Sequence, residues 1–283
     1  MTIPAFLLFV AFFIFPILSG MYFSLTDWNG LSTTWSFVGF RNYIRAFNDP
    51  AIYDSLKFSL YYVALVVVFI TPLATALALL LNKNIHLKIF FRSIFFFPAM
   101  LSLIVSALIW KSIFYRFIPE IGEILGIQFL QKSLLSSKTT AIFGILMIHI
   151  WQGTAIPMVL VLAGLQSIPQ DLYEVARIDG ANARQQFRHI TLPFLIPVLQ
   201  MVFILLLKSG ILVYEYVLAT TMGGPGRATL CITLLILNKG FGYYGAKVDL
   251  SYGVTISLQL FVIIAVISLA QLKLTSKKEV GQL

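Results

Sequence analysis

The chain has 283 residues, of which 59% are hydrophobic and only 11% are charged. Soluble domains carry about a quarter charged residues, so this composition excludes an ordinary soluble protein and predicts one that crosses a membrane several times. The net charge of +9 fits basic loops at a membrane surface better than nucleic-acid binding. A single cysteine, Cys231, excludes an internal disulfide and a multi-cysteine metal site.

Six segments are apolar enough to cross about 30 Å of hydrocarbon as helices. The predicted spans are about 3–25, 58–81, 93–110, 141–165, 194–219 and 253–272. The first could instead be a cleaved signal peptide, but it lacks a basic start and a clear cleavage site, so we expect a retained span. This pattern predicts an all-α fold, with one transmembrane domain over residues 1–283 and both termini on one side.

The connections between the predicted spans differ in their content of aromatic, apolar and basic residues. After the first span come Trp28, Trp35, Phe37 and Tyr43, aromatic residues that suit a membrane–water interface. The apolar stretch from Thr229 to Leu237 is too short to cross and predicts an outer or re-entrant helix. Lys and Arg are denser in the short connections on the side of the tail, which we therefore expect to be cytoplasmic.

The longest polar passage between two spans runs from Ser167 to Pro193. Ser167-x-x-Gln170 reads as a capping box that opens a short helix. On that helix, one apolar face is predicted to carry Leu172, Val175 and Ala176. Gly180 can end the helix, because glycine accepts backbone angles that other residues resist.

A second short helix is predicted after this elbow. Its apolar side carries Ala183, Phe187 and Ile190, and Pro193 is expected to mark where the chain turns back. Two amphipathic helices between membrane spans make a compact knob on one aqueous side. We therefore predict a docking element, although an ordinary amphipathic connector is the alternative.

The residues of this passage match a known pattern, written EAA, DGA, F, I, LP. The matching positions include Glu174, Ala176, Asp179, Gly180, Ala181, Phe187, Ile190, Leu192 and Pro193. The passage therefore resembles the coupling helix of the membrane subunits of ATP-binding-cassette (ABC) importers. The resemblance implies that it sits in a cleft of a cytoplasmic ATPase; Val175 departs from it, since the family usually has alanine there.

Two further stretches carry the resemblance. TDWN and FVG-x-x-NY, after the first span, resemble the sugar-permease branch of that family and its larger-type subunit. Thr221 with Gly223-Gly224-Pro225 resembles the T-x-G-G-P that follows the fifth span. Gly and Pro suit a sharp turn where the chain leaves the membrane, and a role in gating is the alternative.

The resemblance implies a set of partners and a location. These are a second homologous permease, two ABC ATPase subunits, an extracytoplasmic solute-binding protein, a carbohydrate substrate and membrane lipid, with no nucleic acid. The chain itself would bind no cofactor, since ATP and Mg belong to the partner ATPase. The protein would be a multi-pass component of a bacterial or archaeal plasma membrane.

The sequence lacks the motifs of an enzyme. It has no G-x-x-x-x-G-K-[ST] loop to hold ATP, no H-E-x-x-H and no G-x-S-x-G. Its histidines, His86, His149 and His189, lie on different predicted segments without metal-ligand spacing. We therefore predict no catalytic or metal-binding residue. The alternative function is an ion-gradient-driven transporter of a polar solute, which would need carboxylates in the membrane.

Charged groups at membrane depth are costly and suggest function. Lys208 falls near the middle of the fifth span, and Glu215 lies seven residues on, predicted on the same face. Both could face a wet cavity and contact a hydroxyl-rich solute, or they could form a structural pair. Tyr214 precedes Glu215, where relatives often have an aromatic residue followed by aspartate.

The fourth span offers His149, Trp151, Gln152 and Gly153 near mid-membrane. Aromatic faces beside amide or imidazole donors suit a sugar, and glycine lets a ligand or another backbone come close. Since the matching spans of sugar permeases line the solute path, His149, Gln152 and Gly153 are path candidates, with Gln259 a weaker one. Polar residues hydrogen-bonded between helices are the alternative.

Overall fold

A computed structural model describes residues 2–83, 86–245 and 247–279 of the chain. Residues 1, 84–85, 246 and 280–283, which include both ends of the predicted domain, lie outside the described residues. The described residues form helices and no strand, apart from one isolated bridge between Thr26 and Phe37, so the all-α prediction is confirmed. They form two compact units: unit 1 comprises Met1–Leu56 and Ile232–Leu283, and unit 2 comprises Lys57–Cys231.

The helical runs provide four to six candidates for the six predicted spans. Four runs of the described residues are long and apolar enough to cross a membrane: Ile3–Phe23, Pro50–Asn82, Ala183–Thr220 and Leu250–Gln271. Two bent pairs qualify when each pair is taken as one span: Lys88–Met100 with Leu103–Ile124, and Ala141–Gly153 with Ala155–Gln166. The described chain therefore supplies up to six spans.

In the part of the chain that the structure describes, three π-helical turns interrupt the helices, and each is followed closely by a proline. They are η1 (Val10–Ile14) before Pro16, η3 (Ile113–Phe117) before Pro119, and η5 (Phe187–Thr191) before Pro193. Proline has no N–H, and its ring crowds the carbonyl four residues earlier. A widened π turn removes that conflict and lets the helix continue.

The prediction that Pro193 turns the chain back is therefore wrong. The helix α11 (Ala183–Gln186) passes through η5 into α12 (Leu192–Ile211), which places Pro193 in the first turn of α12. This run continues after a short break into α13 (Tyr214–Thr220). The fifth span thus begins within the polar passage and not after it.

The core of unit 2 follows one stripe of the helix α4 (Pro50–Asn82). The stripe recurs every three or four residues and is at most 1% exposed: Tyr62, Val66, Ile70, Ala74, Ala78 and Leu81. Glycines let neighbouring helices approach closely. A Cβ atom on Gly210 of α12 would lie 2.9 Å from Cγ2 of Val63 of α4. A side chain there would push the two helices apart.

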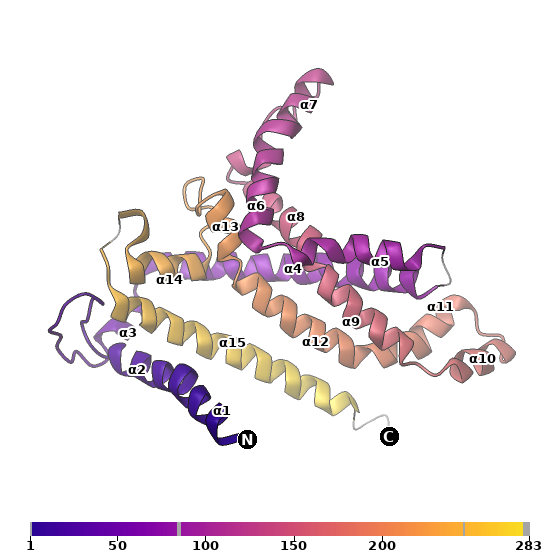
Figure 1. Cartoon of the computed structure of the whole chain (residues 1–283), viewed down its shortest axis with the longest axis horizontal. Coiled ribbons are helices and arrows are strands. Elements are labelled where there is room, and N and C mark those ends of the chain that lie inside the picture. Colours follow the sequence, from indigo (N-terminus) through magenta and orange to yellow (C-terminus); the bar gives the residue numbers. More distant parts are fainter. Residues whose placement is uncertain (1, 84–85, 246, 280–283) are drawn as a thin grey trace. The chain divides into compact units, whose positions relative to one another are not determined.

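The third span, predicted over about 93–110, is sharply bent and longer than predicted. It comprises α5 (Lys88–Phe96), the 3₁₀ turn η2 (Phe97–Met100), α6 (Leu103–Ser112), η3 and α7 (Ile118–Ile124). Between η2 and α6, Leu101 and Ser102 have extended backbones, and the two arms meet at 98°. Figure 1 shows α6 and α7 leaving α5 at this steep angle.

The fourth span bends more gently, by 43°, between α8 (Ala141–Gly153) and α9 (Ala155–Gln166). Pro157 lacks an N–H, and its ring crowds the carbonyl of Gly153, four residues earlier. Thr154 also donates its hydroxyl to the carbonyl of Ile150 at 2.6 Å, a bond that bends helices. Beside this span, α12 packs on α9 and α13 packs on α6 (Figure 1).

Unit 1 is built on the last helix, α15 (Leu250–Glu279). Its other helices are α1 (Thr2–Phe9), η1, α2 (Phe15–Phe23), α3 (Arg41–Phe47) and α14 (Ile232–Phe241). Three of them, α2, α3 and α14, pack on α15 (Figure 1). The short helix predicted over 229–237 is present as α14, 10 residues long. Two 3₁₀ turns, η4 (Leu134–Ser136) in unit 2 and η6 (Tyr243–Gly245) in unit 1, complete the elements.

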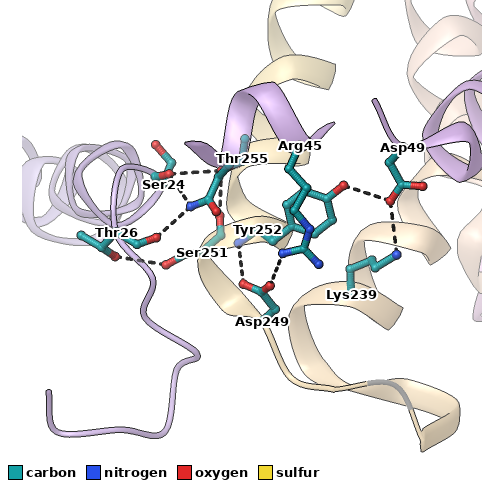
Figure 2. Close-up of polar contacts among 10 residues, drawn as sticks. Ser24, Thr26, Arg45, Asp49, Lys239, Asp249, Ser251, Tyr252 and Thr255 are labelled. Atoms are coloured by element: carbon teal, nitrogen blue, oxygen red, sulfur yellow. Dashed lines mark hydrogen bonds and ion pairs between the residues drawn. The ribbon is translucent and has the colours of Figure 1, made fainter. Parts of the chain in front are cut away.

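A set of polar side chains, which we call the unit 1 cluster, joins these helices (Figure 2). Its members are Ser24, Thr26, Asn42, Arg45, Asp49, Lys239, Asp249, Ser251, Tyr252 and Thr255. Asn42 donates from its amide to the carbonyls of Ser24 at 2.9 Å and Thr26 at 2.7 Å. It thereby holds α3 against the end of α2.

Two aspartates of the cluster each serve two purposes. Asp49 accepts the Ala51 N–H at 3.0 Å and so caps α4, while its other oxygen accepts from Lys239 at 3.2 Å and from the Tyr252 hydroxyl at 2.9 Å. Asp249 likewise accepts the Tyr252 N–H at the start of α15 and pairs with Arg45 at 2.6 Å. These caps explain why α4 and α15 begin earlier than predicted.

The charge of Asp49 should stabilise unit 1 only when the carboxyl is ionised. Partial burial raises the pKa of Asp49, but bonds from Tyr252, Ala51 and Lys239 and the Lys239 charge outweigh it and hold the pKa below its ordinary value of 3.8. A lowered pKa means stability that is present above the unfolded pKa and is lost as pH falls through the folded one.

We therefore expect Asp49→Asn, which keeps a capping oxygen, to lower the free energy of unfolding by about 1 kcal/mol at neutral pH. The difference should shrink as the pH falls below 3.8 and vanish below the lowered pKa of the folded state, where wild-type Asp49 is protonated too. Thermal denaturation of the detergent-solubilised protein at several pH values measures it. If the variant is less stable than the wild type by the same amount at every pH, the loss comes from packing and not from the charge of Asp49.

Candidate functional site

The predicted docking passage presents an apolar helix face to the outside of the chain. The helix α10 (Gln170–Ile178) exposes Leu172 by 38%, Val175 by 56% and Ile178 by 85%. Ala176, predicted on the same face, is half-buried instead. Large apolar side chains exposed at a three-residue spacing indicate a surface that another molecule covers.

The capping box predicted at Ser167-x-x-Gln170 is wrong. The Ser167 hydroxyl donates to the carbonyl of Gly164 at 2.9 Å, so Ser167 ends α9 and does not open α10. A capping box does open α11: the Asn182 side chain accepts the Gln185 N–H at 3.0 Å, and the Gln185 side chain accepts the Asn182 N–H at 2.8 Å. The N-x-x-Q spacing of Asn182 and Gln185 is present in the sequence and could have predicted this capping box.

Gly180 forms the elbow that the sequence predicted. Its φ is +76°, its N–H donates to the carbonyl of Arg177 at 3.1 Å, and the Ala181 N–H donates to the carbonyl of Ala176 at 2.8 Å. These two bonds define a Schellman motif, in which the residue after the helix cap is left-handed. A Cβ atom at Gly180 would meet nothing within 4 Å, so only the backbone angle demands glycine here.

Residues on both sides of the elbow line an open pocket of about 270 Å³. Its lining residues are Ala176, Asp179, Ala181, Gln185, Gln186, His189 and Ile190. The structure thus brings together three of the predicted coupling residues, Ala176, Asp179 and Ala181. Sequence reasoning missed the polar ones, Gln185, Gln186 and His189. The Tyr173 hydroxyl, 2.8 Å from that of Thr191, ties α10 to the fifth span.

The other predicted coupling residues do not line this pocket. Glu174 is exposed on α10, Phe187 is half-buried on η5, and Leu192 and Pro193 lie at the start of α12. Coupling to an ATPase stays a prediction for all of them.

Two of the solute-path candidates are buried and use their polar atoms inside the chain. His149 is 2% exposed, and its Nδ1 lies 3.1 Å from the hydroxyl of Tyr62. Gln152 is 5% exposed; its Nε2 donates to the carbonyl of Leu101 at 2.8 Å, and its Oε1 accepts the Tyr216 hydroxyl at 3.0 Å. Their contact with a solute stays a prediction.

The bonds of Gln152 join three spans at the bend of the third. Leu101 is extended, so its carbonyl has left the helical ladder, and an unpaired carbonyl inside a membrane costs several kcal/mol. The amide of Gln152, on α8, pairs with that carbonyl, and Tyr216, on α13, pairs with the amide oxygen. We call Leu101, Gln152 and Tyr216 the bend joint.

Gly153 serves the packing of the preceding helical turn. A Cβ atom there would lie 2.7 Å from Cδ2 of His149 and 3.3 Å from Cδ1 of Ile70. The absence of a side chain therefore leaves room for the His149 ring, which lies 5.3 Å from the ring of Tyr216.

Lys208 and Glu215 do not share the continuous helix face that the sequence predicted. The helix breaks at Leu212, between α12 and α13, and the described residues contain no ion pair between the two side chains. Lys208 is exposed on a stripe with Met201, Leu205 and Leu212. Glu215 and Tyr214 are half-buried on α13. A role in the solute path stays a prediction for all three.

Sequence reasoning missed several polar residues that the spans bring together. Tyr62 and Tyr216 lie in apolar runs and were not singled out, although their hydroxyls pair with His149 and Gln152. Lys111 was placed after the third span, but α6 includes it, and its Nζ donates to the carbonyl of Ala219 at 3.4 Å. Within the described residues, no three His, Cys, Asp or Glu side chains are placed to hold a metal ion.

The Gly-Gly-Pro stretch forms the predicted turn after α13. Gly223 has a φ of +86°, and Thr229 donates its hydroxyl to the carbonyl of Gly224 at 2.6 Å. The hydroxyls of Thr221 and Thr229 lie 2.7 Å apart and close the loop.

Comparison with known proteins places the chain in a family. Residues 70–277 match the family of binding-protein-dependent transport system inner membrane components. The multiple sugar-binding transport system permease protein MsmF of Streptococcus mutans is 40% identical, over 96% of this chain and 92% of that protein.

Two solved structures share the fold. One is a bacterial ABC transporter that imports the acidic polysaccharide alginate, with a TM-score of 0.80, 20% identity, and 98% of this chain and 94% of that chain covered. The other is a bacterial alginate ABC transporter in complex with an alginate pentasaccharide-bound periplasmic protein, with a TM-score of 0.77, 21% identity, and 96% and 91% covered. The chain belongs to the family of inner membrane components of binding-protein-dependent transport systems.

Proposed function

We propose that this chain is the permease subunit of an ATP-driven ABC importer that moves a carbohydrate across the membrane. A separate solute-binding protein delivers the carbohydrate, and separate subunits bind and hydrolyse ATP with Mg. The chain itself has no phosphate-binding loop and so needs those partners. A carbohydrate is supported by the name of MsmF, a sugar permease, and by the polysaccharide of the alginate transporter.

The observation that carries this proposal is the exposed face of α10. Leu172, Val175 and Ile178 project outward from a short helix whose ends are fixed by Pro169 and by the Gly180 elbow. A short amphipathic helix that is rigidly held at both ends fits a groove on a partner protein. The groove of a cytoplasmic ATPase is the partner surface that we propose for it.

Lys208 supports pairing with a second permease. A lysine exposed in a span, between Met201, Leu205 and Leu212, is costly against lipid. A partner subunit or a water-filled path on that side of α12 would remove the cost. We therefore place the solute path beside this stripe, between the two permeases.

The mechanism follows from coupling between α10 and the spans. ATP binding would draw two ATPase subunits together and carry the docked helices with them. Because η5 and α12 continue directly from α11, such a movement would reach the fifth span without a flexible connection. The solute path would then open to the other side, and hydrolysis would reset it.

Affinity purification of the tagged protein from native membranes in mild detergent tests the proposal. We expect an ABC ATPase and a second permease to accompany it, and the Leu172→Asp variant to lose the ATPase while keeping the permease. The matched substitution Leu31→Asp, on an exposed residue of unit 1, should keep both. Purification without an ATPase, and uptake that follows the proton gradient and not ATP, would establish a gradient-driven transporter instead.

A further inference from the structure

The short helix α3 has three distinct sides. Asn42 and Ala46 are buried, at 6% and 2% exposure, on the side that packs on α15. At 100° per residue, Arg41 and Arg45 lie together on a flank. Figure 2 shows Arg45 reaching across the ring of Tyr252, 3.9 Å from its centre, to Asp249. These contacts fix how the helix is turned about its axis.

The side opposite to the buried one is large, apolar and exposed. Phe40, Ile44 and Phe47 are spaced as i, i+4 and i+7, and their exposed fractions are 70%, 62% and 65%. Single exposed apolar residues are common, but three large ones in line on a helix held in one orientation are not. Something other than water is therefore expected to cover them.

The end of α3 is arranged for surroundings that are poor in water. A helix leaves its last four carbonyls unpaired, and water normally pairs with them. Here the carbonyls of Ile44, Arg45, Ala46 and Phe47 all accept bonds within the chain. The donors are the Asn48 side chain at 2.8 Å, the Asn48 N–H at 3.1 Å, the Asp49 N–H at 3.3 Å and the Tyr53 hydroxyl at 2.8 Å. Complete internal pairing is what a lipid environment requires.

The position of α3 in the chain indicates that lipid covers its apolar side. The span Ile3–Phe23 ends before it, and the span Pro50–Asn82 begins directly after it, so α3 lies at a membrane surface. Tyr53, whose hydroxyl closes the end of the helix, is in the second turn of α4 and 45% exposed. In the chain, the apolar side of α3 thus lies between the end of one apolar span and the start of the next.

We propose that α3 is an interfacial helix, with Phe40, Ile44 and Phe47 inserted into the lipid boundary between headgroups and acyl chains. Arg41 and the exposed half of Arg45 lie at the level of the phosphates, where cations on amphipathic helices are held. The unit 1 cluster then ties this lipid anchor to α15 and α14. The inference does not depend on the transported solute or on the ATPase.

Spin labels in the assembled transporter, reconstituted in phosphatidylcholine and phosphatidylglycerol liposomes, test the proposal. Labels are attached at Phe40→Cys, Ile44→Cys and Phe47→Cys, and at Arg41→Cys as the control, after the buried Cys231 is replaced by alanine. Collision rates with oxygen, which concentrates in lipid, and with a polar nickel chelate, which stays in water, are then measured.

We expect the collision rate with oxygen to exceed the rate with the nickel chelate at positions 40, 44 and 47. At position 41 the ratio of the oxygen rate to the nickel rate should be lower. A higher collision rate with the nickel chelate than with oxygen at position 44 would show that this side faces water, and it would overturn the proposal. Low collision rates with both reagents at all three positions would also overturn it, because a partner protein would then cover the helix. Each variant is first checked for assembly and uptake.

Discussion

Gly180→Val is expected to abolish most ATP-driven uptake while the chain still inserts in the membrane and assembles. Gly180 has a φ of +76° at the end of α10, and a left-handed backbone costs an ordinary residue about 1 to 2 kcal/mol and a β-branched residue more. The Schellman bonds from Gly180 and Ala181 would be lost together. The native elbow would thus be populated roughly tenfold less or worse.

Gly180→Asn is the matched control for this variant. Asparagine also adds a side chain, but it tolerates the left-handed region better than other residues. Since a Cβ at this position meets nothing within 4 Å, the first atom of either side chain has room, and the comparison tests chiefly the backbone angles that the two residues accept. We expect Gly180→Asn to retain most of the uptake.

The measurement is uptake and solute-stimulated ATP hydrolysis by the reconstituted importer, together with the amount of ATPase that copurifies. Reduced uptake in Gly180→Val with Gly180→Asn near wild type would support the elbow. Equal activity of the two variants and the wild type would mean that the α10 angle does not control coupling. Equal loss in both would point to side-chain bulk at a partner surface instead of backbone strain.

The sequence was sufficient to predict apolar spans and a polar passage between two of them. It was not sufficient to predict where the helices bend, break or continue. Apolar runs of about 20 residues and a glycine elbow are local signals that need no knowledge of the neighbours. Proline, by contrast, was an ambiguous local signal. Pro193 is absorbed by a π turn and Pro157 bends its span, while Pro98 lies beside a break of 98°. Which outcome occurs depends on whether partners exist for the freed carbonyls, and those partners come from distant helices.

The same limit applies to the candidate solute path. His149 and Gln152 were recognisable as polar residues at membrane depth, but their partners lie 87, 51 and 64 residues away in the sequence. A tyrosine in an apolar run, such as Tyr62 or Tyr216, gives no sign that its hydroxyl meets another span. One sequence by itself does not distinguish a side chain that waits for a solute from one that is already paired with another span.

Gln152→Leu is therefore expected to weaken the bend joint and lower transport without changing which sugar is carried. Leucine fills a similar volume but leaves the carbonyl of Leu101 without its donor and the hydroxyl of Tyr216 without its acceptor. Hydrogen bonds between spans contribute on average about 0.6 kcal/mol and up to about 1.7 kcal/mol each, so the loss should be about 1 to 3 kcal/mol.

Tyr216→Phe provides the comparison, because it removes only one bond of the joint and keeps the bond from Gln152 to Leu101. We expect about half the loss of thermal stability in this variant. The double variant should be less destabilised than the sum of the two, since both singles break the same Tyr216 bond.

Kinetics separates the joint from a sugar contact at Gln152. A joint that holds α6 against α8 and α13 predicts a lower maximal uptake rate and a lower melting temperature of the complex, at an unchanged KM. A label pair on exposed Ile94 of α5 and Leu108 of α6 should report a wider range of distances as the 98° bend loosens. If KM or sugar preference changes while the melting temperature and the label distances stay the same, Gln152 contacts the solute, and its bonds to Leu101 and Tyr216 exchange during transport.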